Sequence, residues 1–295
     1  MNYKKFSGAG SVALLIVTVV ILALATRAGA QNKYEVLHKF KGGKGGVNPY
    51  AGLVFDGAGN LYGSTLGGGT YGDGVVFKLT PKTDGKWIQS VLHTFRESDG
   101  VGSYGRLTLD SAGSLYGTSI QGGAYGYGVV FKLAPNSDGT WTESVLHSFN
   151  LDGKDGFQLS GGLVFDVAGN LYGTTMYGGD TNAGCNWGWT GCGTVFKLAP
   201  NPDSSWTENV LYSFADGPDG ASPATGLLFD NDGNLYGTAR LGGVFKLVPN
   251  PDGSWTESVI AGMREGPSDL VFDATGNLYF TTWGYGSRGL GAVGN

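Results

Sequence analysis

The sequence has 295 residues with 55 glycines, 41% hydrophobic residues and 13% aromatic residues. Such a chain can bury a substantial core, so its composition excludes a disordered protein. Its formal net charge of −5 argues against nucleic acid and anionic membranes as partners.

The N-terminus predicts a secretory signal peptide over residues 1–30. An apolar run, Val12–Ala25, follows two lysines and precedes the small-residue motif Ala28–Ala30. The run counts 14 residues, whereas a helix needs about 20 to span a bilayer. We therefore expect cleavage after Ala30, no membrane span in the mature chain, and a secreted, extracellular or periplasmic location. Cleavage removes three cationic residues, so the formal charge falls from −5 to −8.

A repeated motif fills the rest of the chain. It begins as GLVFDGAGNLYG at 52 and recurs near 106, 162, 226 and 269. The first four copies are each followed by a VFKL block and then by a block that begins with Trp. These runs of β-branched and aromatic residues, separated by Gly, Asp, Asn and Pro, predict four short antiparallel strands per repeat. Repeats of this size are typical of β-propeller blades.

The two ends of the chain suggest how such a propeller would close. The last copy supplies two predicted strands, near 269–273 and 277–282, and then ends in GLGAVGN without a convincing third strand. Residues 34–40 have the pattern of the missing outer strand. We therefore predict one all-β domain over 31–295, a monomeric propeller of five blades closed by the N-terminal strand. A chain cut short of a larger ring would give a similar pattern.

The repeat blocks resemble those of the GloVer tandem-repeat family of exported bacterial proteins. The shared blocks are GLxxDxxGNLYGTT, GTVFKLxP and W-x-VLYSF, and they extend over nearly all of residues 34–282. The FDxxGNLY segment is also similar to the strand-turn-strand unit of NHL-type propellers. The resemblance implies an extracellular repeat fold, and it implies no particular reaction.

Loop lengths indicate where function lies. Two hairpins have the same length in every repeat: the turn after FD and the turn between the VFKL block and the Trp. The link from the Gly of LYG to the Phe of FKL instead counts 14, 14, 23 and 8 residues, and the links between blades also vary. In an up-and-down blade both variable links emerge on one face, opposite the fixed hairpins. We predict that binding takes place on this variable face.

Aromatic residues in the variable links are the predicted binding residues. The longest link holds Trp187 and Trp189 between Cys185 and Cys192. These cysteines predict a disulfide, since two thiols without a nearby His supply only half of a tetrahedral metal site. Equivalent links carry the further aromatic candidates Tyr71, Tyr125, Tyr127, Tyr177, Trp283 and Tyr285. Such rings suit a glycan or a cell-surface protein, and the alternative is that they cover the core of the blade.

Recurring polar residues are better explained by structure than by catalysis. Each repeat contributes one Asp to the FD turn, the copies being Asp56, Asp110, Asp166, Asp230 and Asp273. A calcium site needs six to eight converging oxygens, so these aspartates predict turns, with calcium as a weak alternative. The three histidines, His38, His93 and His147, share one repeat position and are predicted to be structural. We predict no cofactor and no metal, and a propeller hydrolase or lactonase with a site at the central mouth is the competing hypothesis.

Overall fold

The computed structural model describes residues 34–181, 185, 191–215, 217–263, 267–282 and 292–294. The chain divides into two compact units, residues 1–37 and 38–295. Most of the first unit, including the predicted signal peptide, lies outside the described residues, so cleavage after Ala30 stays a prediction. The only helix in the described ranges is a short 3-10 turn, η1 (Gly43–Gly45).

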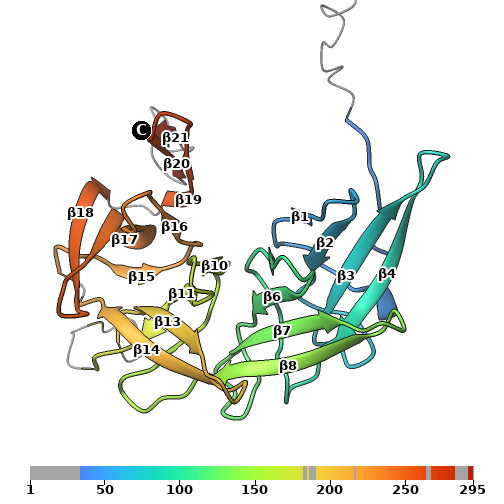
Figure 1. Ribbon diagram of the computed structural model, residues 1–295, viewed down its shortest axis with the longest axis horizontal. Coiled ribbons are helices and arrows are strands. Elements are labelled where there is room, and N and C mark those ends of the chain that lie inside the picture. Colours follow the sequence, from blue (N-terminus) through green and yellow to red (C-terminus); the bar gives the residue numbers. More distant parts are fainter. Residues whose placement is uncertain are drawn as a thin grey trace, which may run out of the picture. The chain divides into compact units, whose positions relative to one another are not determined.

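The second unit is built from antiparallel sheets, as the repeats predict (Figure 1). In all of the main sheets except that of β15 to β18, neighbouring strands follow one another in chain order. We call the sheets blades 1 to 5. Blade 1 contains β1 (Val54–Phe55), β2 (Leu61–Ser64), β3 (Val75–Pro81) and β4 (Trp87–Thr94). Blade 2 contains β5 (Thr108–Leu109), β6 (Leu115–Thr118), β7 (Val129–Pro135) and β8 (Trp141–Ser148). Blade 3 contains β10 (Val164–Phe165), β11 (Leu171–Thr175), β13 (Thr194–Pro200) and β14 (Trp206–Ser213), and β9 (Gly156–Phe157) pairs with β12 (Tyr177–Gly178) beside it.

Blade 4 differs because its link is the shortest. It contains β15 (Ala221–Pro223), β16 (Leu228–Phe229), β17 (Leu235–Pro249) and β18 (Trp255–Met263). An extended strand rises about 3.3 Å per residue, so Gly237 and Phe245 would lie roughly 26 Å apart if β17 were straight. A Cβ placed on Gly237 would instead collide with the Phe245 ring. The chain therefore doubles back within β17, which makes the predicted second and third strands of the blade.

Blade 5 corrects the prediction that the last repeat lacks a third strand. It contains β19 (Pro267–Phe272), β20 (Leu278–Thr282) and β21 (Ala292–Gly294), and β21 pairs with β20. In blade 1 Gly63 stands opposite Phe77, whereas in blade 5 Phe280 stands opposite Gly294. The exchange of Gly and Phe across the pair hides the third strand from a search for FKL.

The structure does not show the predicted outer strand at 34–40. Residues 34–40 contain no strand, and blade 5 has three strands in the described part of the chain. The edge available to an outer strand is short, because β21 spans only three residues. Closure by the N-terminal strand and the number of five blades therefore stay predictions.

Neighbouring blades are joined by repeated ring contacts. In blades 2 to 4 the Tyr of the LYG packs edge-on against the inner-strand Phe of the next blade, as in Tyr116 with Phe165 at 5.0 Å between ring centroids. The Trp that begins an outer strand lies over the Tyr of the preceding blade, as in Trp141 over Tyr62 at 6.2 Å. These rings and the Leu, Val and Phe around them form the buried core between the blades.

Candidate functional site

The carboxylate of the FD-turn aspartate accepts hydrogen bonds from groups of its own hairpin. Asp56 accepts hydrogen bonds from the backbone N–H groups of Ala58 and Asn60, both at 2.9 Å. It also accepts bonds from the Asn60 amide at 2.7 Å and the Tyr62 hydroxyl at 3.0 Å. Gly59 has a φ of 81°, which favours glycine. The prediction that this residue shapes a turn is therefore confirmed.

The variable links are held together by hydrogen bonds between their backbones. In blades 1 to 3 the incoming link and the link between second and third strands hydrogen-bond to each other. Equivalent bonds run from Gly69 N to Gly43 O, Gly123 N to Glu97 O, and Gly179 N to Asp155 O, at 2.7–2.8 Å. Each of these glycines belongs to a Gly-Gly pair with positive φ. The glycine pairs therefore hold the two links of a blade together as one surface.

Two predicted aromatic residues project from this surface. Tyr71 and Tyr125 each follow a Gly-Gly pair on links of equal length, and they are 57% and 60% exposed. The Arg96 guanidinium carbon lies 5.4 Å from the centroid of the Tyr71 ring, a cation–π arrangement. Neither ring is needed to cover the core, so both are available to a ligand.

Two other predicted aromatic residues pack into the blades instead. Tyr127 and Tyr177 are half-buried, and their ring centroids lie 5.6 Å and 5.5 Å from that of the buried Phe157. Tyr127 and Tyr177 therefore cover the blade core, which was the alternative to a binding role. Trp187, Trp189, Trp283 and Tyr285 lie outside the described residues, so their role stays a prediction.

Sequence reasoning missed a second exposed aromatic pair. Tyr50 and Tyr104 precede the inner strands of blades 1 and 2, and their ring centroids are 5.7 Å apart at an interplanar angle of 46°. Both side chains are exposed. Asn48, two residues before Tyr50, accepts a bond from Leu66 N in the link that carries Tyr71. The signal in the sequence was the Tyr that occupies one repeat position in both of the first two copies.

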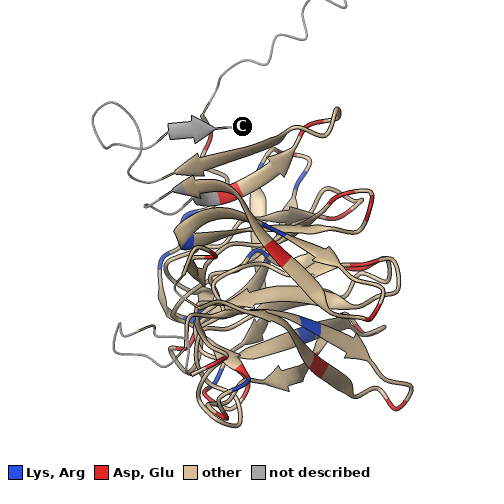
Figure 2. Cartoon of the chain, turned by 90° about the vertical axis from the view of Figure 1, so that its left-hand side faces the viewer, with Lys and Arg blue, Asp and Glu red and all other residues tan. Residues whose placement is uncertain are grey.

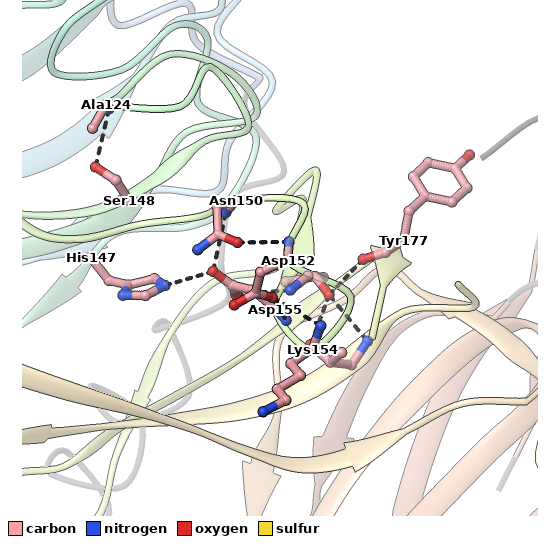
Figure 3. A network of polar contacts seen from close by, with 11 residues as sticks. Ala124, His147, Ser148, Asn150, Asp152, Lys154, Asp155 and Tyr177 are labelled. Atoms are coloured by element: carbon pink, nitrogen blue, oxygen red, sulfur yellow. Dashed lines mark hydrogen bonds and ion pairs between the residues drawn. The ribbon is translucent and has the colours of Figure 1, made fainter. Parts of the chain in front are cut away.

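Two of the three histidines, His93 and His147, lie beside acidic residues of the blade-to-blade links. His147 Nε2 lies 3.0 Å from Asp155 Oδ2, and that oxygen also accepts a bond from Asn150 N (Figure 3). His93 Nε2 lies 3.5 Å from Asp99 Oδ2 in the link from blade 1 to blade 2. Burial lowers the pKa of His93. In blade 3 Tyr212 takes the histidine position and donates to Asp219 at 3.0 Å. These three side chains therefore have a structural role, which is to fasten the links between blades.

The predicted disulfide forms between Cys185 and Cys192, whose Cα atoms are 5.4 Å apart. Cys192 is buried, and its carbonyl accepts a bond from Ser222 N at 2.7 Å. The disulfide therefore secures one end of the longest link against the start of blade 4.

The distribution of charged residues does not locate a binding site. Acidic residues lie on strands and loops of several sheets (Figure 2). Among the described residues, no group of three or more His, Cys, Asp and Glu is arranged to hold a metal ion. Nor does a helix in that part of the chain have the length and apolar character to cross a membrane.

Solved structures share the fold at low sequence identity. A protein of unknown function from Dyadobacter fermentans is 9% identical, with a TM-score of 0.52, and the match covers 86% of this chain and 80% of that one. The extracellular domain of a one-component system from B. thetaiotaomicron is 13% identical with a TM-score of 0.50, over 85% of this chain and 31% of that one. Virginiamycin B lyase from Staphylococcus aureus is 14% identical with a TM-score of 0.48, over 84% and 69% of the two chains.

Curated protein sequences give no match. A family model described as the Gloeobacter/Verrucomicrobia repeat matches residues 24–186, which is more than half of the chain. The match agrees with the resemblance seen in the repeat blocks and with the propeller-like sheets. The chain belongs to the Gloeobacter/Verrucomicrobia repeat family.

Proposed function

We propose that this protein is an exported, non-catalytic binding module whose variable face takes up a glycan. The observation that carries the proposal is the pair Tyr71 and Tyr125, which two links of equal length hold exposed at the same position. The backbone of each link is fixed by hydrogen bonds from its glycines, and the aromatic ring of the same link is exposed to solvent. A large ring held in this way can stack on a ligand.

The surroundings of the rings favour a sugar over a protein surface. A pyranose stacks its C–H face on an exposed aromatic ring, and its hydroxyls need hydrogen-bond donors close by. Arg96 supplies such donors beside Tyr71. The core of a protein interface would instead require a continuous apolar patch, and the neighbours of Tyr71 are Thr70 and Gly72.

Export is supported by two features that do not depend on the rings. The first is the leader pattern over residues 1–30, and the second is the disulfide between Cys185 and Cys192. Disulfides persist in oxidising compartments outside the cytoplasm.

A glycan array with the purified protein tests the proposal. We expect wild type to bind a subset of glycans and the double substitution Tyr71→Ala, Tyr125→Ala to weaken that binding about tenfold or more, since each stacked ring is worth roughly 1 kcal/mol. Val167→Ala is the matched control, because Val167 is fully exposed in a fixed turn on the opposite face. Unchanged binding by the double variant would remove the two tyrosines from the site. Binding to an envelope-protein array but to no glycan would replace the sugar by a protein partner.

A further inference from the structure

Arg106 places a positive charge at a repeat position that is otherwise glycine in blades 1 to 4. The residue before the Leu that leads into the inner strand is Gly52, Gly162, Gly226 and Asp269 in the other copies. A Cβ added to Gly52 would lie 3.4 Å from Arg106 Cδ, and one added to Gly162 would lie 2.9 Å from Arg106 O. One added to Gly226 would lie 3.5 Å from Gly162 O. The copies in blades 1 to 4 therefore lie next to one another, and among them only Arg106 carries a side chain.

The guanidinium of Arg106 is exposed and has no acidic partner among the described residues. Other cations are engaged: Arg96 pairs with Asp99 at 3.4 Å, and the lysines of the FKL blocks lie over tyrosine rings, as Lys132 does over Tyr116. The charge of Arg106 is therefore open to an anionic group from outside the chain.

Two exposed tyrosine rings accompany this charge. Tyr104 precedes Arg106 by two residues, and its ring centroid lies 5.7 Å from that of Tyr50, which has the same repeat position in blade 1. Blades 3 and 4 have Ser160 and Ala224 there, joined by a hydrogen bond of 2.9 Å from Ser160 Oγ to Ala224 O. Because this small polar contact suffices between those blades, the junction does not require two rings that are 69% and 41% exposed.

The backbone that carries the second ring and the guanidinium is fixed on both sides. Ser64 Oγ donates to Ser103 Oγ at 3.0 Å, and both residues are buried. Gly105 is buried as well, and a Cβ added to it would collide with Gly161 O in the next blade. Groups that are positioned before a ligand arrives cost less to order when it binds.

These rings belong to the variable face. In blade 2, Gly102 O accepts a bond at 2.9 Å from Ile120 N, in the link that carries Tyr125. The corresponding bond in blade 1 joins Asn48 to the link that carries Tyr71. The same two links therefore anchor both aromatic pairs.

We propose that Arg106, Tyr50 and Tyr104 form a subsite for a sugar that carries a carboxylate, such as a uronic acid. A guanidinium binds a carboxylate through two parallel N–H···O bonds, and the rings can stack on the face of the pyranose. One guanidinium also balances the single charge of a carboxylate. The inference rests on the proposed glycan binding and adds the class of glycan.

A glycan array that places each uronic-acid glycan beside its neutral parent tests the subsite in the full chain. We expect wild type to bind the acidic member at least about tenfold more tightly, because hydrogen bonds to charged groups are strong. Arg106→Gly should bring the two affinities within about twofold of each other, and it should fold because three other repeats have glycine there. Arg106→Lys should keep part of the preference, since lysine retains the charge but not the planar fork. An undiminished preference in Arg106→Gly would overturn the proposal.

Two controls separate this subsite from other uses of charge. Arg240→Gln removes an exposed cation from the corresponding link of blade 4 and should not change the preference. An equal loss in that variant would reduce the effect to general electrostatics and overturn the proposal. Asp269→Asn should not weaken binding of the acidic member. A loss equal to that of Arg106→Gly would assign the two charges to each other and also overturn it.

The rings and the proposed function are tested separately. Tyr50→Ala combined with Tyr104→Ala should weaken binding of the acidic member about tenfold or more, and unchanged binding would contradict their place in the subsite. Equal binding of acidic and neutral members by wild type would overturn this inference and leave the proposed function standing. Binding of neither member would refute the proposed function itself, and the subsite with it.

Discussion

At the scale of single residues, one carboxylate of the FD turn accepts hydrogen bonds both from the turn backbone and from a tyrosine hydroxyl. Burial alone would raise the pKa of Asp166, but hydrogen bonds from Asn170, Tyr172 and Ala168 lower it. The same bonds occur at Asp56 and Asp230. The repeat retains this residue because it satisfies two turn N–H groups and a tyrosine hydroxyl together.

We expect Asp166→Ala to destabilise the protein by about 1–3 kcal/mol, because it leaves the hydroxyl of the buried Tyr172 without its acceptor. Urea unfolding measures the change. Asp203→Ala is the control, since Asp203 bonds only to the exposed Ser205 in the other fixed turn. Equal losses in the two variants would show that the tyrosine contact adds nothing.

Three glutamates at the blade junctions have carboxyl groups that are partly buried and incompletely hydrogen-bonded. Glu143 shares one face of β8 with Trp141, which packs on blade 1. Burial, and next the nearby Asp99, raise the pKa of Glu143 to about 7. The equivalent Glu208 and Glu257 have pKa values raised to about 7 by burial and by Asp155 and Asp219. One carboxyl oxygen of each is buried without a hydrogen-bond partner in the described structure.

Blade 1 carries Gln89 at this position, and its amide donates to Gly45 O at 2.8 Å. A raised pKa means that the folded protein binds the proton more tightly than the unfolded chain does. The stability supplied by the protonated glutamates is therefore full below about pH 4.5 and is lost as the pH rises through about 7.

We expect Glu208→Gln to stabilise the protein by about 1 kcal/mol at pH near 8 and to change little at pH near 4.5, a value reduced to allow for solvent screening. Urea unfolding at both pH values gives the comparison, with Gln89→Glu as the reverse substitution that should lower stability near pH 8. The same gain for Glu208→Gln at both pH values would contradict a titrating carboxyl.

At the scale of elements, the pairing of the second and third strands of a blade depends on a Gly that lies beneath a Phe. A Cβ added to Gly117 would lie 2.5 Å from Phe131 Cζ. The rings of Phe77 and Phe196 lie similarly close over Gly63 and Gly173. The sequence predicts these strands because the LYG and FKL blocks recur together. It does not predict β21, because in blade 5 the Phe and the Gly exchange strands.

We expect Gly117→Ala to cost about 1–3 kcal/mol through overpacking, and Phe131→Leu in the same molecule to recover part of the loss. A double-mutant cycle by urea denaturation measures the coupling. Purely additive losses would argue that the two residues do not meet.

At the scale of the whole molecule, repeat spacing was enough to predict the propeller blades and the fixed and variable loops. The candidate site was predicted less completely, because exposure depends on neighbours that spacing does not reveal. Tyr125 and Tyr127 are two residues apart in one link, yet only Tyr127 packs on Phe157. Tyr50 and Tyr104 escaped notice because later repeats have Ser160 and Ala224 at their position.

Export is a property of the whole chain and has its own test. We expect the intact mass of the secreted protein to correspond to an N-terminus at Gln31, because the small residues Ala28 and Ala30 suit signal peptidase. A secreted product that keeps residues 1–30 would contradict the predicted leader.

Hydrogen exchange with and without a glycan selected on the array shows whether binding takes place on the variable face. We expect slower exchange in residues 66–74 and 120–128, the links that carry Tyr71 and Tyr125, and no change in the fixed turns at 166–170 and 201–205. Slower exchange confined to those fixed turns would contradict binding on the variable face.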